Sequence, residues 1–264
     1  MLLKNKTETQ LQFIGTSSGI TSKDRFHSSF IISSRDRVIL IDAGDSVCKA
    51  ILNAGYEFTD ITDIILTHFH ADHVSGIAPL LTQMKIAGRE ISLKIYTPEI
   101  LENNLQFYLE MTYLFEENFG YPFEIIPITD KEYNKIGTNF NFSIIQNSHV
   151  SPKNLARAKN EIPFYSGSLY FTVGNAEIFY TSDIGSNNDL KLYGAKKPGI
   201  FISECAHVEL QDVLDEWIIS GAEKLFLTHY DEDTLPIIEH FIDTAGKKYH
   251  GKIIMAVDQL IIPL

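Results

Sequence analysis

The sequence predicts an α/β protein in which two β-sheets pack face to face and helices cover their outer surfaces. Strand-like apolar runs alternate with helical patterns in both halves of the chain. Two expected strand pairs end in the related tripeptides Asp42-Ala43-Gly44 and Asp183-Ile184-Gly185, which suggests two similar halves facing each other. No low-complexity linker divides the 264 residues, so residues 1–264 are predicted to form a single domain.

The expected elements follow from local composition. Strands are expected where apolar and β-branched runs are bounded by turn residues, at 11–14, 29–33, 38–41, 61–67, 91–96, 123–128, 140–145, 168–173, 177–181, 199–203, 225–228, 253–256 and 260–262. Helices are expected where apolar residues recur with helical spacing, at 46–56, 74–87, 99–118, 208–220 and 234–244. Gly55 and Gly88 end the first two helices, and Pro98 stands at the start of the third.

The composition is that of an ordinary globular protein, with 44% hydrophobic and 21% charged residues. A net charge of −12 argues against a protein that coats nucleic acid, because phosphate binding depends on Lys and Arg. No run approaches the roughly 18–20 apolar residues that a membrane span requires. The first residues lack the apolar middle of a signal peptide, and two cysteines make no disulfide framework. These features predict a cytoplasmic location.

The most informative stretch follows the strand expected at 61–67, where His68, His70, Asp72 and His73 occur within six residues. Histidines at this density repel one another when protonated and need partners when buried. One or two divalent metal ions are therefore the expected partner.

Other metal-competent side chains also follow apolar strands directly: His149, Asp183, Glu204 and His229. Because function in α/β proteins gathers at one end of the strands, they are expected to join the same site. His207 is a further candidate. The remaining histidines, His27, His240 and His250, are expected at the surface or in packing.

The heptapeptide Thr67-His68-Phe69-His70-Ala71-Asp72-His73 resembles the signature of the metallo-β-lactamase superfamily of dinuclear metal hydrolases. Asp42, His149, Asp183 and His229 fall in the order of that superfamily's other motifs. Residues 15–19, and 80–89 running into 95–98, are similar to the branch of ribonuclease Z and class II cyclic-nucleotide phosphodiesterases. The resemblance implies a four-layer αβ/βα sandwich, with two mixed β-sheets flanked by helices.

The resemblance also implies ligands for two divalent metal ions. His68, His70 and His149 would hold one ion, Asp72, His73 and His229 would hold the second, and Asp183 would bridge the two. Imidazole suits zinc, although the same ligands accept manganese or iron. Two ions about 3.5–4 Å apart lower the pKa of a shared water toward ~7 and so supply hydroxide to attack phosphorus. Asp72 would accept the water proton, and Asp42 would orient a ligand histidine.

Glu204 and His207 resemble a glutamate–histidine pair of the ribonuclease Z branch, although a longer insert usually separates that pair. As an imidazolium, His207 would stabilise a non-bridging or leaving oxygen of the phosphodiester. Glu204 would orient the imidazole and raise its pKa. The alternative is that His207 only begins the helix expected at 208–220.

The function implied is metal-dependent phosphodiester hydrolysis by a ribonuclease Z-like RNA endonuclease, acting on tRNA 3′ ends or other RNA. The first alternative is a small substrate such as a cyclic nucleotide. The acidity favours it, and so does the absence of the Gly/Pro-rich arm with which long-studied ribonucleases Z grip tRNA. The second alternative is hydrolysis of a lactone, thioester or β-lactam, and the last is a non-enzymatic metal-binding module.

Two further expectations concern partners. A basic stretch at 152–159, within the loop 151–161 after His149, either holds a phosphate over the site or is solvated. The resemblance also leans toward a homodimer.

Overall fold

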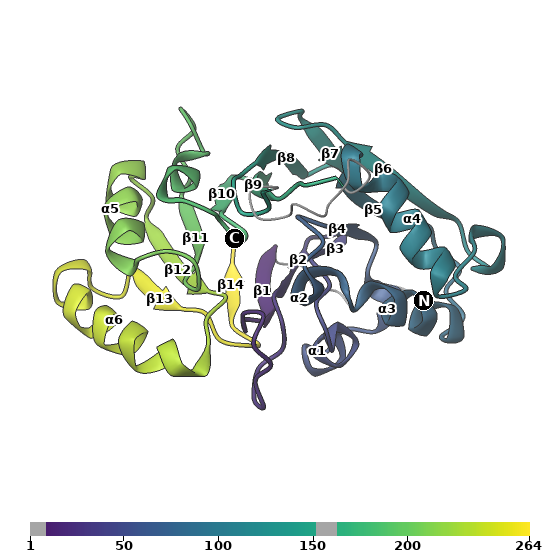
Figure 1. Ribbon diagram of the computed structural model, residues 1–264, viewed down its shortest axis with the longest axis horizontal. Coiled ribbons are helices and arrows are strands. Elements are labelled where there is room, and N and C mark those ends of the chain that lie inside the picture. The colour runs from purple at the N-terminus through teal and green to yellow at the C-terminus, as the bar shows by residue number, and fades with distance from the viewer. Residues whose placement is uncertain (1–8, 152–162) are drawn as a thin grey trace.

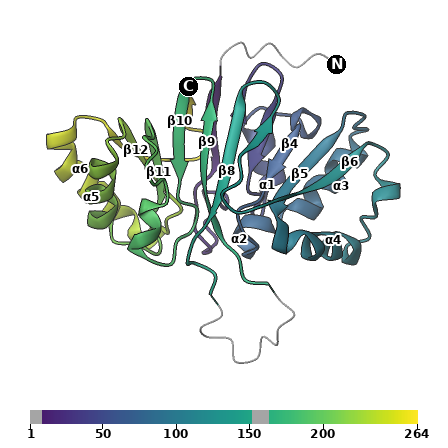
Figure 2. The ribbon, with the colours of Figure 1, turned by 90° about the horizontal axis from the view of Figure 1, so that it is seen from above.

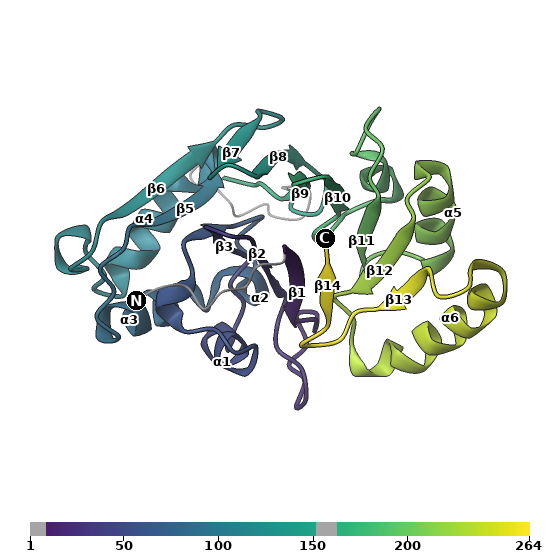
Figure 3. The same cartoon turned by 180° about the vertical axis from the view of Figure 1, so that it is seen from behind.

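The computed structural model describes residues 9–151 and 163–264, and its centre is a pair of seven-stranded sheets packed face to face (Figure 1). The first sheet has the order β14-β1-β2-β3-β4-β5-β6. Its strands are β1 (Gln10–Gly15), β2 (Ser29–Ser33), β3 (Val38–Ile41), β4 (Asp63–Ile65), β5 (Leu93–Pro98), β6 (Phe123–Ile128) and β14 (Ile261–Pro263). Figure 3 shows the last strand, β14, beside β1, with which it pairs antiparallel.

The second sheet has the order β13-β12-β11-β10-β9-β8-β7. Its strands are β7 (Asn134–Ile136), β8 (Phe140–Gln146), β9 (Gly167–Val173), β10 (Ala176–Tyr180), β11 (Ile200–Glu204), β12 (Lys224–Thr228) and β13 (Ile253–Met255). In each sheet three antiparallel pairings are followed by three parallel ones. The two halves therefore repeat one pattern, as the paired Asp-x-Gly tripeptides suggested.

Helices cover the outer face of each sheet (Figure 2). The α-helices are α1 (Val47–Asn53), α2 (Ala71–Val74), α3 (Ile77–Ile86), α4 (Glu102–Met111), α5 (Leu210–Ser220) and α6 (Leu235–Tyr249). The single turns are η1 (Phe58–Asp60), η2 (Glu99–Leu101), η3 (Glu116–Asn118), η5 (Asn187–Lys191) and η6 (Glu232–Thr234). The first sheet carries α1, α3 and α4, and the second carries α5 and α6, which confirms the predicted four layers. None of the helices in the described ranges is long and apolar enough to cross a membrane.

The strands are apolar on both faces because each sheet is covered by the other sheet on one face and by helices on the opposite face. In β2, Phe30 and Ile32 enter the core between the sheets, while Ile31 packs toward the helices. Burial on both faces explains the continuous apolar run of β3. These two layers of packing fix the sheet ends from which the candidate ligands project.

The structure corrects two of the expected helices. The helix expected at 74–87 begins only at Ile77, as α3, and Val74 is instead the last residue of the short α2, because the chain turns between the two where Gly76 packs closely on the backbone oxygen of Gly44. The helix expected at 99–118 is also wrong at its end. It stops at Met111, Tyr113 adopts a left-handed φ of 61°, and only the turn η3 follows.

Smaller differences concern strand and helix ends. The strand expected at 61–67 is the shorter β4, so the residues after Ile65 already form the turn that leads to His68. Pro98 is the last residue of β5 and also the N-cap residue of η2, so it stands at the start of a helical segment as expected, whereas α6 continues past 244 to Tyr249. The strand β7 has no counterpart among the expected elements. The basic stretch 152–159 lies outside the described residues.

Candidate metal centre

The predicted ligands meet at one end of the sandwich, just beyond the carboxyl ends of four strands. His68 follows β4, His149 follows β8, Asp183 follows β10 and His229 directly follows β12. The other three belong to the short helix α2: His70 is its N-cap residue, and Asp72 and His73 occupy consecutive positions within it. The structure thus brings together all seven residues that the sequence picked out.

The first group consists of His68, His70, His149 and Asp183, which each offer one ligand atom within 4.8 Å of the others. His149 Nε2 lies 2.9 Å from His70 Nδ1 and 3.5 Å from Asp183 Oδ2. His68 Nε2 lies 3.9 Å from the same carboxylate oxygen. His68 is buried whereas His70 is exposed, so this group opens to solvent on one side.

The second group consists of Asp72, His73, His229 and again Asp183. His73 Nε2 and His229 Nε2 lie 3.1 Å and 3.3 Å from Asp183 Oδ1. His229 Nε2 is also 3.1 Å from Asp72 Oδ2. Asp183 therefore turns one carboxylate oxygen toward each group, which is the arrangement that a bridging ligand requires.

The electrostatics of the two groups differ. Burial lowers the pKa of His68 well below its usual value and lowers the pKa of His149 to about 4, so both imidazoles stay neutral. Burial alone would lower the pKa of His73 too, but the carboxylates of Asp183 and Asp42 raise it far above the usual value. Burial opposes ionisation of Asp183, yet His229 and His73 hold its pKa well below the usual range.

The residues fit divalent ions. His68 Nε2 is buried and has no hydrogen-bond partner among the residues that the structure describes. Such buried lone pairs are costly unless a partner is present, and a metal ion is one such partner. Histidine and carboxylate donors without cysteine, open on one side, resemble hydrolytic rather than closed structural zinc sites.

Asp42 supports both ligand-bearing segments from behind. Its Oδ1 accepts the backbone N–H of Thr67 at 2.8 Å, and its Oδ2 lies 2.8 Å from His73 Nδ1. Thr67 also donates its hydroxyl to this carboxylate. A carboxylate bound to the far nitrogen of an imidazole fixes the tautomer and leaves Nε2 free for the site. This geometry matches the orienting role that the sequence suggested.

Three non-glycine residues beside the ligands adopt left-handed backbone conformations: Asp42 (φ 58°), Ser182 (φ 51°) and His229 (φ 54°). Such conformations cost about 1–3 kcal/mol each and persist only where surrounding contacts enforce them. For His229 the contacts come partly from Arg25, whose Nη1 donates to the backbone oxygen of Tyr230 at 2.8 Å. The guanidinium also lies 4.1 Å above the Tyr230 ring.

Glu204 and His207 stand at the rim of the centre. Glu204 is fully buried at the end of β11, and its Oε1 lies 3.1 Å from His207 Nδ1. Its Oε2 accepts the backbone N–H of His207 at 2.8 Å. The hydrogen bond to Glu204 raises the pKa of His207. The half-exposed imidazole stacks edge-on with His149, with 4.7 Å between ring centroids, so it borders the first group.

Several polar residues that hold the ligand-bearing segments in place could not be predicted from the sequence. Asn147 and Arg25 lie in loops and Asp189 lies in the turn η5, and only the folded chain shows which backbone groups they bind. His27 was assigned to the surface or to packing. It is half-buried, and within the described residues neither of its ring nitrogens has a hydrogen-bond partner. His240 and His250 are exposed, as expected.

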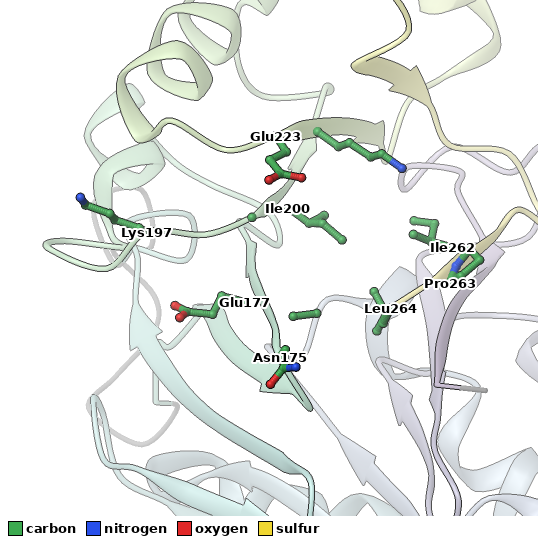
Figure 4. Close-up of a pocket in the computed structure, with 11 residues that line it drawn as sticks. Asn175, Glu177, Lys197, Ile200, Glu223, Ile262, Pro263 and Leu264 are labelled. Carbon is green, nitrogen blue, oxygen red and sulfur yellow. The ribbon is translucent and has the colours of Figure 1, made fainter. Parts of the chain in front are cut away.

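A separate pocket of about 400 Å³ lies at the opposite edge of the second sheet (Figure 4). It is formed where β10, β11 and β12 begin, whereas the candidate ligands follow the ends of strands. Its charged lining residues, Glu177, Lys197, Glu223 and Lys224, are exposed and of both signs. This pocket is therefore not part of the metal centre.

Gly44 is expected to tolerate no side chain. A Cβ there would lie 2.1 Å from the backbone oxygen of Asp72. Gly44→Ala should therefore push α2 away and cost about 1–3 kcal/mol of unfolding free energy, as overpacking does. Gly246→Ala is the control, because a Cβ in that part of α6 meets nothing within 4 Å and should stabilise by up to ~1 kcal/mol. Urea unfolding measures both; equal stabilities would contradict the prediction.

Comparisons with known proteins agree with this geometry. Residues 9–247 match the family model described as "Anti-Pycsar protein Apyc1". Ribonuclease Z of Methanocaldococcus jannaschii is 34% identical over 140 residues, which cover 52% of this chain and 42% of that enzyme. The chain thus spans less than half the length of this curated relative.

Among solved structures, the metallo-β-lactamase fold protein YhfI from Bacillus subtilis superposes with a TM-score of 0.76 at 19% identity. The alignment covers 97% of this chain and 99% of YhfI. Human tRNase Z, short form, superposes with a TM-score of 0.71 at 16% identity, covering 96% and 98% of the two chains. The fold is therefore of the metallo-β-lactamase type, and the chain belongs to the Anti-Pycsar protein Apyc1 family.

Proposed function

We propose that the protein is a metal-dependent phosphodiester hydrolase. The observation that carries this proposal is the position of Asp183, whose two carboxylate oxygens face two separate histidine groups. A mononuclear or purely structural site does not need a shared carboxylate. Two-metal centres of this kind are common in phosphatases and nucleases, where they act on both the attacking and the leaving oxygen.

The ligand assignment is part of the proposal. One ion would be held by His68, His70 and His149, the other by Asp72, His73 and His229, with Asp183 between them. Zinc is the proposed metal because imidazole is the main donor, with manganese and iron as alternatives. When bound, the two ions would supply Lewis-acid activation of a water molecule and of the phosphodiester.

The protein's own side chains have distinct tasks in this proposal. Asp72 accepts the proton of the attacking water, because its partly exposed carboxylate lies in the second group, 3.1 Å from His229 Nε2, and is held ionised. Burial opposes its ionisation, but the hydrogen bond from His229 keeps the pKa of Asp72 far below the usual value. His207 acts as an imidazolium beside the phosphodiester and stabilises a non-bridging or leaving oxygen. Glu204 orients that imidazole.

Two substrate classes are proposed. RNA, such as a tRNA 3′ end, follows from the similarity to ribonuclease Z. A small phosphodiester such as a cyclic nucleotide is favoured by the net charge of −12 and by the course of the chain after β5. There the chain enters η2 and α4 at once, and both begin with glutamates, Glu99 and Glu102. A homodimer is a further proposal, which light scattering on the purified protein tests.

The test of the reaction class compares turnover of bis-p-nitrophenyl phosphate with that of a chromogenic β-lactam and a lactone, before and after chelation. Phosphodiester turnover that chelation abolishes and metal restores is expected. Elemental analysis should find two metal ions per chain. Hydrolysis of only the lactone or β-lactam by metal-loaded protein would overturn the proposal. Cleavage of RNA and of cyclic nucleotides, with salt-dependent tRNA binding, then separates the two substrate classes.

A further inference from the structure

Asp189 has no role in the reaction as proposed. One oxygen of its carboxylate accepts an unusually large number of hydrogen bonds. The residue lies in η5 and is 6% exposed. Its Oδ2 accepts the Ser148 hydroxyl at 2.6 Å and three backbone N–H groups. These belong to Ser148 (3.2 Å), Gly185 (3.0 Å) and Ser186 (3.1 Å). A buried carboxylate with this many donors is firmly fixed.

The donors come from two loops that carry ligand candidates. Ser148 immediately precedes His149, which follows β8, while Gly185 and Ser186 follow Asp183 in the loop after β10. The loops touch directly, because a Cβ on Gly185 would lie 2.3 Å from the backbone oxygen of Ser148. Asp189 therefore joins the two segments whose separation sets the distance between His149 and Asp183.

Local helix geometry does not account for these contacts. Asp189 does help to cap η5, since Ser186 is the N-cap residue of that turn. A capping role needs only the Ser186 N–H. The two bonds from Ser148 join a segment that lies 41 positions away in the chain. They leave Ser148 no freedom to move away from the Asp183 loop.

We propose that Asp189 is a positioning residue for the ion held by His68, His70 and His149, and that it acts by fixing His149 against Asp183. The inference rests on the proposed metal centre. Asp183 itself has other supports, because Asn147 Nδ2 donates to its backbone oxygen at 2.9 Å. The next residue, Ile184, donates its N–H to Glu204. His149 has a long bond of its own, from its N–H to Asn147 Oδ1 at 3.2 Å. Because loss of Asp189 removes both bonds from the adjacent Ser148, it should displace His149 more than Asp183.

The second ion serves as an internal reference. It shares Asp183 with the first ion, but its other three ligands, Asp72, His73 and His229, lie on α2 and after β12, and none of these three is adjacent to a donor to Asp189. Asp42 and Arg25 hold those segments instead. A defect that only loosens the fold would lower the affinity for both ions, whereas a positioning defect at Asp189 lowers the affinity for one of them.

The experiment is calorimetric titration of Zn²⁺ into chelator-treated protein, for wild type, Asp189→Ala and Asp189→Asn. Asp189→Ala should lower the affinity for one of the two ions about 10–100-fold and leave the affinity for the other within about threefold of the wild-type value. Asp189→Asn keeps an acceptor oxygen and should lose less affinity. Asp212→Ala is the matched control, since Asp212 accepts a hydrogen bond from Asn187 of the same turn and, in the part of the chain that the structure describes, none from the segments that carry His149 and Asp183. It should titrate like wild type.

His149→Ala identifies the affected ion. If Asp189 acts through His149, adding Asp189→Ala to that variant should cause no further loss of affinity. Melting temperatures of the metal-free variants report structural damage separately. Unchanged affinities, or equal loss at both ions, would overturn the inference. Failure of the wild type to bind two ions would instead count against the proposed function.

Discussion

Asp183→Asn is expected to remove at least one metal ion and to lower phosphodiester turnover about 10³-fold or more. Among the ligand candidates in residues 9–151 and 163–264, this side chain alone faces both groups, with Oδ2 toward His149 and Oδ1 toward His73 and His229. An amide has the same shape but no charge, and it offers only one oxygen. Metal ions contribute several kcal/mol to such reactions, and each 1.36 kcal/mol is a tenfold change in rate.

Elemental analysis of dialysed protein and turnover of bis-p-nitrophenyl phosphate measure the two effects. Glu223→Gln is a suitable control, because this exposed carboxylate lies at the opposite edge of the same sheet. It should keep both ions and full turnover. If Asp183→Asn retained two ions and wild-type turnover, Asp183 would not be the bridging ligand.

Much of the architecture could be predicted because short stretches of the sequence determine where its strands begin and end. The strands β2, β3 and β6 begin and end as expected, since turn residues bound their apolar runs. The end of α4 could not be predicted. No glycine or proline stands between Glu99 and Gly120, and the break comes from the left-handed conformation at Tyr113. The split between α2 and α3 likewise depends on a contact with Gly44, distant in the sequence.

The candidate site divides in the same way. Its ligands lie in a dense motif or follow strands, so their residue types and positions make them predictable. Glu204 follows from the same rule, whereas Asp42 is expected only from the family resemblance. Asn147 and Asp189 are different. They are single polar residues, one in a loop and one in the turn η5, and their importance lies in which backbone groups they bind once the chain has folded. The sequence shows which residue types could bind a metal, but it does not show which tertiary hydrogen bonds a single polar residue will make.

His207→Ala is expected to lower turnover about 10²- to 10⁴-fold while the protein keeps two metal ions. The imidazole is the half-exposed member of a pair whose other member, Glu204, is fully buried. Glu204 binds both His207 Nδ1 and its backbone N–H, so the ring is held with Nε2 available to a substrate. His240→Ala, which removes an exposed histidine of α6, should have no effect.

The choice of substrate separates the two tasks proposed for His207. p-Nitrophenolate leaves without a proton, whereas the alkoxide of a ribose needs one. If His207 protonates the leaving oxygen, His207→Ala should impair cyclic-nucleotide or RNA cleavage far more than cleavage of bis-p-nitrophenyl phosphate. If it stabilises a non-bridging oxygen, both reactions should slow equally. If His207→Ala lost a metal ion as well as turnover, neither of these two tasks would explain the result. Glu204, His207 and His229 also lie close enough to hold an ion, and His207 would then be a ligand.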